Sequence, residues 1–312
     1  MCRLILGIAT SPEAIEKLSE ALWNFYRAAE LDLKLEMVIR EYVNPPPTFS
    51  PSHCDGYGYV ALIWKRGRIQ PISLYEKFDA YSSKHDVLDR NICRENLVAL
   101  RCAVETLNSR LALAEKAVVL FHARKASRGQ PRGTKHAHPY QAVLDTVYGP
   151  LELFLAHNGS VRREEIAKLL GLYPYTNYTD SYLLLQLVSR YVESTGSLEK
   201  LHDNLVEALS KGSKFEERGY NVALVAYDPY SEEIHVVFSG RLREDARSKA
   251  RIEYYKTYTY LEPSLLLWLS STIKDNLGAS SSFRQEYFTE IDNKVCKVFI
   301  ENSQPRYMCK KL

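Results

Sequence analysis

Hydrophobic positions near the start of the chain change from a short continuous run to a helical spacing. The run Cys2–Ile8 is mostly apolar and predicts a short buried strand. Ser11 follows as a candidate N-cap, and Pro12 occupies the position that proline favours in a first helical turn. Apolar residues then recur every three or four positions, which is typical of the buried stripe of a helix: Ile15, Leu18, Leu22 and Tyr26.

The same patterns predict further strands and helices along the rest of the chain. Strands are expected at Tyr57–Trp64, Arg68–Leu74, Ala117–His122, Leu151–His157, Asn221–Tyr227, Ile234–Ser239 and Arg251–Tyr260, and a final hairpin at Glu286–Ile291 and Lys294–Ile300. Helices are expected at Arg94–Arg110, Glu164–Leu170, Thr179–Glu193, Leu198–Ser210 and Pro263–Leu277. Because neighbouring strands have hairpin-type links, this order favours antiparallel sheets covered by helices over a parallel doubly wound sheet.

Composition narrows the class of protein but not its chemistry. The chain has 312 residues, of which 46% are hydrophobic and 25% charged, so it can form a packed core of one large domain or two ordinary ones. The formal net charge of +3 argues against a protein that coats DNA. No apolar stretch approaches the length of a membrane helix or of a signal peptide, and we expect a cytoplasmic protein. In that compartment six scattered cysteines are expected to be free thiols.

Cys2 is the first residue with chemical potential. If Met1 is removed after synthesis, the Cys2 thiol lies beside a free α-amino group. An α-amine titrates near ~7.7 to 8.0, so a useful fraction is an unprotonated base at neutral pH. One residue would then supply both a nucleophile and a general base. A cysteine at position 2 alone remains weak evidence, since it occurs in many proteins without such a role.

Further motifs in a fixed order strengthen this reading. They are Met1-Cys2-Arg3, Asp55-Gly56-Tyr57-Gly58, His122-Ala123-Arg124, the run from Arg124 to His138-Pro139-Tyr140, Leu155-Ala156-His157-Asn158-Gly159, and Asp180-Ser181. Together they resemble the class II glutamine amidotransferases, a branch of the N-terminal-nucleophile (Ntn) hydrolases. The match is most similar to the stand-alone branch, in which the glutaminase domain is not fused to a synthase. It covers roughly residues 2 to 260.

The resemblance implies a fold and a set of roles. The fold would be an α+β, four-layer αββα sandwich, in which residues 1–260 form the amidotransferase-like domain and 261–312 add a helix and a hairpin to it. Cys2 would attack the side-chain amide of glutamine or of another γ-glutamyl compound, and release ammonia through a γ-glutamyl thioester. The Asn158 side chain and the Gly159 backbone N–H would stabilise the oxyanion. Substrate binding would fall to Arg124, for the α-carboxylate, and to Asp180, for the α-ammonium.

Other expectations concern cofactors and partners. The sequence has neither a P-loop nor a GxGxxG motif, and we expect no cofactor and no metal. A zinc site could use His53 and Cys54, but no second pair stands at ligand spacing. A separate synthase could receive the ammonia, whereas a membrane or nucleic-acid partner is not expected. The three histidines beside the motifs are interpreted as hydrogen-bonded scaffold: His122, His138 and His157.

Several alternatives stay open at this stage. The family commonly has Asp-Ser-Glu where this chain has Asp180-Ser181-Tyr182, so a catalytically silent binding or regulatory module is the competing reading. Asn158-Gly159 is also a common turn dipeptide, and we expect a tight turn there. The basic loop is either simply solvated or recruits an anionic second substrate or acidic partner; it comprises Lys125, Arg128, Arg132, Lys135 and His136.

Overall fold

Two antiparallel sheets form the centre of the computed structural model, which describes residues 2–41, 50–68, 70–81, 90–126, 130–146, 149–193, 200–242 and 248–312. The first sheet has seven strands, in the spatial order β11 (Phe288–Ile291), β9 (Thr257–Glu262), β10 (Leu265–Ser270), β1 (Arg3–Ala9), β4 (Ala114–Ala123), β2 (Tyr57–Lys65) and β3 (Ile72–Phe78). The second has six, in the order β13 (Gln304–Lys311), β12 (Lys294–Glu301), β8 (Ile234–Gly240), β7 (Glu216–Tyr227), β6 (Gly149–Val161) and β5 (Tyr140–Thr146).

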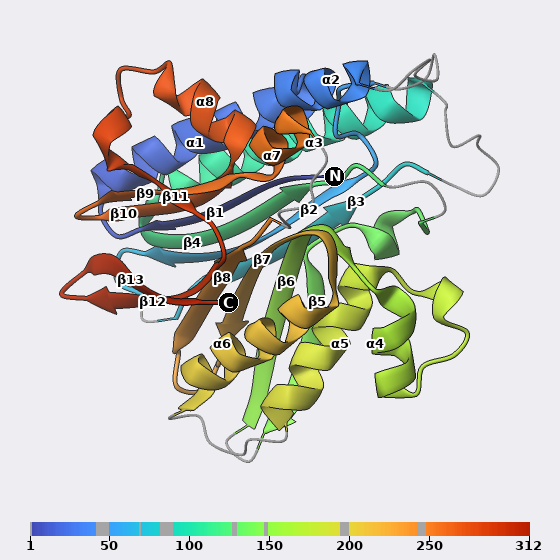
Figure 1. Cartoon of the computed structure of the whole chain (residues 1–312). Coiled ribbons are helices and arrows are strands. Elements are labelled where there is room, and N and C mark those ends of the chain that lie inside the picture. The colour runs from blue at the N-terminus through green and yellow to red at the C-terminus, as the bar shows by residue number, and fades with distance from the viewer. Residues whose placement is uncertain are drawn as a thin grey trace.

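Helices cover the outer face of each sheet, which gives four layers (Figure 1). Beside the first sheet lie α1 (Pro12–Glu30), α2 (Leu33–Arg40), α3 (Arg90–Leu111), α7 (Lys249–Tyr255) and α8 (Ser271–Gly278). Beside the second lie α4 (Arg163–Leu170), α5 (Asp180–Glu193) and α6 (Leu201–Gly212). A third apolar cluster fills the space between the two sheets, where Leu4 and Leu6 of β1 meet Phe154 of β6. The α+β class and the two antiparallel sheets expected from the sequence are confirmed.

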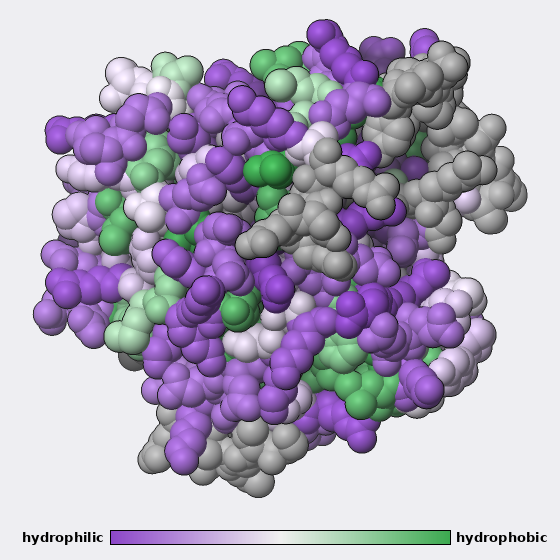
Figure 2. Space-filling model, in the orientation of Figure 1, coloured by the Kyte–Doolittle hydropathy of each residue, from purple (hydrophilic) through white to green (hydrophobic). Residues whose placement is uncertain are grey.

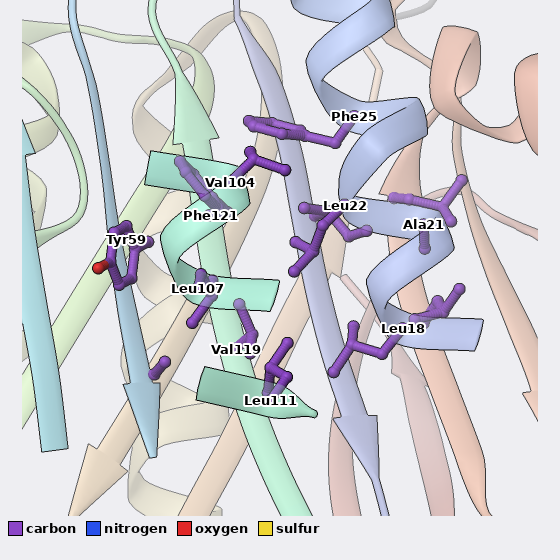
Figure 3. Close-up of a cluster of buried hydrophobic side chains, with 14 of the residues drawn as sticks. Leu18, Ala21, Leu22, Phe25, Tyr59, Val104, Leu107, Leu111, Val119 and Phe121 are labelled. Carbon is purple, nitrogen blue, oxygen red and sulfur yellow. The ribbon is translucent and has the colours of Figure 1, made fainter. Parts of the chain in front are cut away.

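The helix α1 shows how the sequence pattern produces this packing. Its N-cap is Ser11, whose hydroxyl accepts a hydrogen bond from the Ala14 N–H at 3.2 Å, as the sequence predicts. Figure 3 shows Leu18, Leu22 and Phe25 pointing from α1 into the cluster between the helices and the first sheet. These side chains are fully buried. Of the predicted stripe, Ile15, Leu18 and Leu22 lie on the face of α1 that packs on the sheet, whereas Tyr26 is only partly buried and the neighbouring Phe25 is the buried aromatic.

Removing the cap should destabilise the protein by a small, measurable amount. Ser11→Ala leaves the Ala14 N–H without its side-chain acceptor, and we expect a loss of about 1 kcal/mol in the free energy of unfolding. Urea denaturation monitored by circular dichroism measures it. Ser281→Ala, at an exposed turn position, is the matched control and should stay within about 0.5 kcal/mol of wild type. Equal stabilities of both variants would show that the cap contributes nothing.

The C-terminal elements differ from the sequence prediction. The expected helix Pro263–Leu277 is wrong in its first half, because Leu265–Ser270 forms the strand β10 and only Ser271–Gly278 is helical. All six residues of β10 are buried, because the strand lies inside the sheet and its side chains pack alternately toward the helices and toward the second sheet. A strand covered on both faces has a continuous apolar run, which periodicity cannot separate from a buried helix.

Two other expected elements are corrected in the same region. The expected strand Arg251–Tyr260 divides into the helix α7 (Lys249–Tyr255), capped by the Ser248 hydroxyl, and the strand β9. The expected hairpin of 286–291 and 294–300 is also wrong: β11 pairs with β9 in the first sheet, whereas β12 pairs with β8 and β13 in the second. The last 52 residues, 261–312, therefore contribute strands to both sheets.

Cysteine pairing also departs from the expectation of free thiols. Disulfides join Cys54 to Cys93 and Cys296 to Cys309, while Cys2 and Cys102 are free. The second disulfide lies across the paired strands β12 and β13, where Cys296 and Cys309 are directly opposite. Spacing along the chain could not predict these pairs, because each depends on which segments fold together.

The surface facing the viewer is mainly hydrophilic, with hydrophobic residues in small separate groups (Figure 2). Among the helices of the described ranges, none is both long enough and apolar enough to span a bilayer.

Candidate active site

Cys2 lies where the two sheets approach each other. It directly precedes β1, whose first residue, Arg3, pairs with Ala123 at the end of β4. The Cys2 backbone N–H donates to Asn158 Oδ1 on the opposite sheet at 2.9 Å. The Cys2 Sγ accepts from the Lys125 N–H at 3.5 Å, and only 5% of the residue is exposed. A nucleophile candidate is thus held from both sheets at once.

Asn158 lies within β6 and does not form the tight turn that the Asn-Gly dipeptide suggests. The strand continues to Val161, and Asn158 is opposite Asn221 of β7. Gly159 is required at the next position because a Cβ atom there would lie 1.8 Å from the Gly219 carbonyl oxygen. The glycine therefore permits close contact between two strands, which is a role that the turn reading missed.

The oxygen and the nitrogen of the Asn158 amide differ in their hydrogen bonding in the described part of the chain. Its Oδ1 must be the atom near Cys2, because a backbone N–H can only donate. Its Nδ2 is then buried without a hydrogen-bond acceptor in the described part of the chain. Unpaired buried donors are costly and rare in folded proteins, so this donor is a candidate for contact with a ligand.

Arg124 follows the end of β4 and adjoins the motif Asp55-Gly56. Its backbone N–H donates to the Gly56 oxygen at 2.9 Å, and its backbone oxygen accepts from the Asp55 N–H at 3.0 Å. Only 4% of Arg124 is exposed. Its Nη2 donates to the Pro131 oxygen at 2.8 Å, whereas its Nη1 has no acceptor among the residues described. Arg124 thus offers a second buried donor without an acceptor in the described ranges, and it directly precedes Lys125, whose N–H donates to Cys2 Sγ.

Asp180 begins α5, as predicted, and lies beside the end of β6. Its Oδ2 accepts from the Val161 N–H at 3.2 Å and its Oδ1 from the Ser181 N–H at 2.9 Å. Within the described ranges no hydrogen bond joins it to Cys2, Arg124 or Asn158. Burial raises the pKa of the Tyr140 hydroxyl. The positive charge of Arg124 lowers this pKa and the negative charge of Asp180 raises it, so both charged groups act on the same phenol.

Tyr182 carries an aromatic ring in contact with other rings. The Tyr182 ring stacks on Tyr178, with centroids 5.5 Å apart, and meets Tyr140 edge to face at 5.7 Å. Its backbone N–H donates to Thr179 Oγ1 at 3.1 Å, which in turn bonds the Tyr140 hydroxyl at 2.6 Å. The Tyr182 ring therefore extends an aromatic cluster beside Asp180.

Histidines form a buried polar layer behind the site. His122 Nε2 and His138 Nδ1 are 2.9 Å apart, and His157 Nδ1 lies 3.1 Å from the Ser181 hydroxyl. Burial is the main cause that lowers the pKa of each of these three rings. Their hydrogen bonds agree with the scaffold role expected from the sequence.

Acid should destabilise the protein because its buried histidines are neutral. The pKa of every histidine in the described ranges is lowered, mainly by burial, and that of His53 falls to about 4. Between this value and the unfolded value near ~6.5, the unfolded chain binds more protons than the native protein, so stability falls as the pH falls. We expect the urea midpoint to drop steeply from pH 7 to pH 4.5. A midpoint that stays constant over this interval would contradict neutral buried rings.

A buried charged network that the sequence did not suggest lies beneath Cys2. The Arg3 guanidinium and the Asp32 carboxylate form an ion pair, and both side chains are fully buried. Asp32 also accepts from His53 Nε2 at 2.7 Å and from Thr272 Oγ1 at 2.7 Å. The Tyr254 ring packs 4.1 Å from Arg3 Cζ, and its hydroxyl donates to the Cys2 oxygen at 3.4 Å. The signal available in the sequence was Arg3 itself, a charged residue in an apolar strand.

The residues of the basic loop differ in their contacts and in their exposure. Arg132 pairs with Asp55 at 2.7 Å, and Lys125 Nζ donates to the Ser50 oxygen at 3.0 Å. His136 is buried and Lys135 is exposed. Arg128 lies outside the described residues. The loop is therefore not simply a solvated segment.

The zinc alternative loses its thiol ligand, since Cys54 is in a disulfide and His53 bonds Asp32. No group of three or more potential metal-ligating side chains occurs in the described ranges.

Neither protein-family models nor curated proteins gave a match to the chain. Among solved structures, the chain is similar to a 2.0 Å crystal structure of a predicted glutamine amidotransferase from Pseudomonas aeruginosa PA01, at 13% identity and a TM-score of 0.39, with 93% of each chain covered. A TM-score below 0.5 does not establish a shared fold, so the functional argument rests on the site itself.

Proposed function

We propose that the protein is a class II glutamine amidotransferase-like amidohydrolase of the Ntn type, with a Cys2 nucleophile. One observation carries the proposal: buried Cys2 is bonded through its nitrogen to Asn158, while Asn158 Nδ2 and Arg124 Nη1 are buried donors without acceptors among the described residues. A substrate that brings a carboxylate and a developing oxyanion would satisfy both donors. Glutamine carries both groups.

The reaction follows from the roles of these groups. With Met1 removed, the Cys2 α-amine takes the thiol proton, and the thiolate forms a C–S bond to the γ-carbonyl carbon as the carbonyl electrons move to oxygen. Asn158 Nδ2 and the Gly159 N–H stabilise that oxyanion. The C–N bond then breaks, and the amine proton leaves with ammonia. Water adds to the thioester, gives its proton to the amine and releases glutamate, which regenerates the thiol.

The remaining substrate contacts are assigned by charge. Arg124 binds the α-carboxylate, for which a planar guanidinium is well suited. Asp180 binds the α-ammonium; a carboxylate has about four acceptor sites, so its bonds to the Val161 and Ser181 N–H groups leave room for a further donor. Ammonia would pass to water or to a separate synthase.

We further propose that 261–312 extend the amidotransferase-like domain of residues 1–260, because β10 pairs with β1 beside Cys2. A cytoplasmic location stays a prediction. It would require that the two disulfides persist there, as in the cytoplasm of hyperthermophiles.

Two measurements test the proposed function: the products formed from glutamine and the intact mass of the protein. Purified protein incubated with glutamine should release ammonia and glutamate in equal amounts, and its intact mass should lack Met1. Retained Met1 with no ammonia release would instead favour the catalytically silent module, because an acylated Cys2 nitrogen cannot act as a base.

Removal of the Asn158 amide should reduce turnover without loss of the fold. Loss of one oxyanion donor lowers kcat by about 10²- to 10³-fold in well-studied hydrolases, and we expect Asn158→Ala to lie in this range. Asn276→Ala, which removes a partly buried amide on α8, is the control and should retain wild-type kcat. A kcat for Asn158→Ala within a few-fold of wild type would exclude the oxyanion role.

A further inference from the structure

Three cations near the proposed active site have no acidic ion-pair partner among the described residues. In the described part of the molecule, Arg124, Lys77 and Lys135 form no ion pair, although Arg132 in the same loop pairs with Asp55. Two of them donate to backbone oxygens instead: Lys77 Nζ donates to the Lys135 oxygen at 3.1 Å, and Arg124 Nη2 to the Pro131 oxygen at 2.8 Å. Neighbouring positive charges that form no ion pair favour an anionic ligand.

The geometry brings these cations to one loop segment. Lys77 Nζ lies 4.7 Å from the centre of the Tyr140 ring, and the Tyr140 hydroxyl donates to the His136 oxygen at 3.1 Å. Burial, followed by the positive charges of Arg124, Lys135 and Lys77, lowers the pKa of His136 to about 4. Asp79 is an acid that opposes this shift at His136, and its carboxylate already accepts from the Gly133 N–H at 2.8 Å.

Strand register places Lys77 on the same face of the sheet as the nucleophile. Lys77 of β3 is opposite Gly58 of β2, Gly58 is opposite His122 of β4, and His122 is opposite Leu4 of β1. Because side chains alternate along a strand, Leu4 and Cys2 share a face, which is the one toward the second sheet. Three strand spacings separate Lys77 from Leu4, or about 14 Å between Cα atoms.

We propose that Lys77 and Lys135 form a subsite, next to Arg124, for a second anionic group of the substrate. This inference rests on the proposed function and specifies its substrate. In a γ-glutamyl amide the glutamyl part is fully engaged by its γ-carbonyl, α-carboxylate and α-ammonium. The second anion must therefore belong to the amine joined to the γ-carbonyl, as in a γ-glutamyl amino acid.

A small substrate fits this position better than a large partner does. Arg124 and His136 are buried and Lys77 is only partly exposed, so within the described part of this loop Lys135 and Thr134 are the residues most open to a macromolecular surface. Burial, and after it Arg124, lowers the pKa of Lys77 to about 8, so this lysine remains mostly charged at pH 7. An anion bound there would relieve the repulsion between the cations.

The test compares probes that differ only in charge. γ-Glutamyl-glycine and γ-glutamyl-glycinamide have the same length, but only the first has a carboxylate on the leaving amine; γ-glutamyl-aminomethylphosphonate tests a phosphonate in its place. We expect wild-type kcat/KM to favour at least one anionic probe over the glycinamide by about tenfold or more. The double variant Lys77→Gln, Lys135→Gln should reduce this ratio to about one.

Lys116→Gln is the matched control. Lys116 also lies partly buried over an aromatic ring, with Nζ 4.5 Å from the centre of Trp64, but at the opposite end of the β2–β4 pair. It should keep the wild-type ratio. Equal kcat/KM for charged and neutral probes in wild type, or a ratio unchanged in the double variant, overturns the subsite.

Calorimetric titration of Cys2→Ala protein with the same probes separates this failure from failure of the proposed function. Cys2→Ala protein should bind an anionic probe more tightly than the glycinamide, and this preference should disappear when Lys77→Gln and Lys135→Gln are added. That result supports the subsite even if the wild-type protein hydrolyses none of the probes. Equal binding of all three probes overturns it.

Discussion

Cys2→Ala should abolish ammonia release from glutamine while the protein remains folded. Loss of the nucleophile from a hydrolase removes the covalent pathway, and we expect kcat to fall by at least about 10⁴-fold. The structural cost should be small, because alanine keeps the backbone N–H that donates to Asn158 Oδ1 at 2.9 Å. Coupled assay of ammonia measures the rate, and urea denaturation measures the fold.

The chain offers its own control for this variant. Cys102 is the other free thiol in the described ranges, and it is exposed on α3. Cys102→Ala should retain full activity and near wild-type stability. Activity that survives in Cys2→Ala, or is lost equally in both variants, would rule out a Cys2 thioester.

Asp32→Asn should produce the largest loss of stability. The substitution keeps the shape of the side chain but leaves the Arg3 guanidinium fully buried without a counter-charge. Burial alone would raise the pKa of Asp32, yet Arg3 and His53 outweigh it and hold the pKa well below the usual range. Breaking a buried pair by removal of one charge costs about 3 to 5 kcal/mol, and we expect a loss of this size. Thermal and urea unfolding measure it at pH 7.

A mostly exposed ion pair provides the comparison. Asp203 pairs with Lys297 at 2.7 Å, but 70% of the Asp203 side chain is exposed. Asp203→Asn should therefore lose less than about 1 kcal/mol, because water screens the interaction. If Asp32→Asn lost no more than Asp203→Asn, the buried network would contribute nothing beyond a surface pair. Arg3→Met together with Asp32→Leu tests the same point by removing both charges, and should recover part of the loss.

Local signals in the sequence predicted the elements that depend on local chemistry. Ser11 and the spacing of apolar residues predicted α1, and the turn at Asp228-Pro229 predicted the β7–β8 hairpin. The wrong secondary-structure predictions lie where pairing with distant strands determines the conformation. Leu265–Ser270 could be helix or strand until β1 and β9 are known to pair with its two edges.

The candidate site shows the same division. The sequence singled out Cys2, Arg124 and Asn158, and the fold connects Cys2 directly to Asn158 and to Lys125, the residue after Arg124. It did not reveal that Asp32, 29 residues away, partners Arg3, because that contact exists only when the loop before α2 packs beneath β1. Gly159 was misread for a related reason, since its need for a hydrogen in place of Cβ comes from the neighbouring strand.

The central claim is that Cys2 is an N-terminal nucleophile that recognises a glutamyl group. The most direct measurement treats purified protein with a diazoketone analogue of glutamine and locates the adduct by peptide mass mapping. The account predicts one adduct per chain, on Cys2, in a peptide that lacks Met1, with excess glutamine protecting against labelling. Labelling confined to Cys102, or labelling of Cys2 that glutamine does not slow, would contradict it.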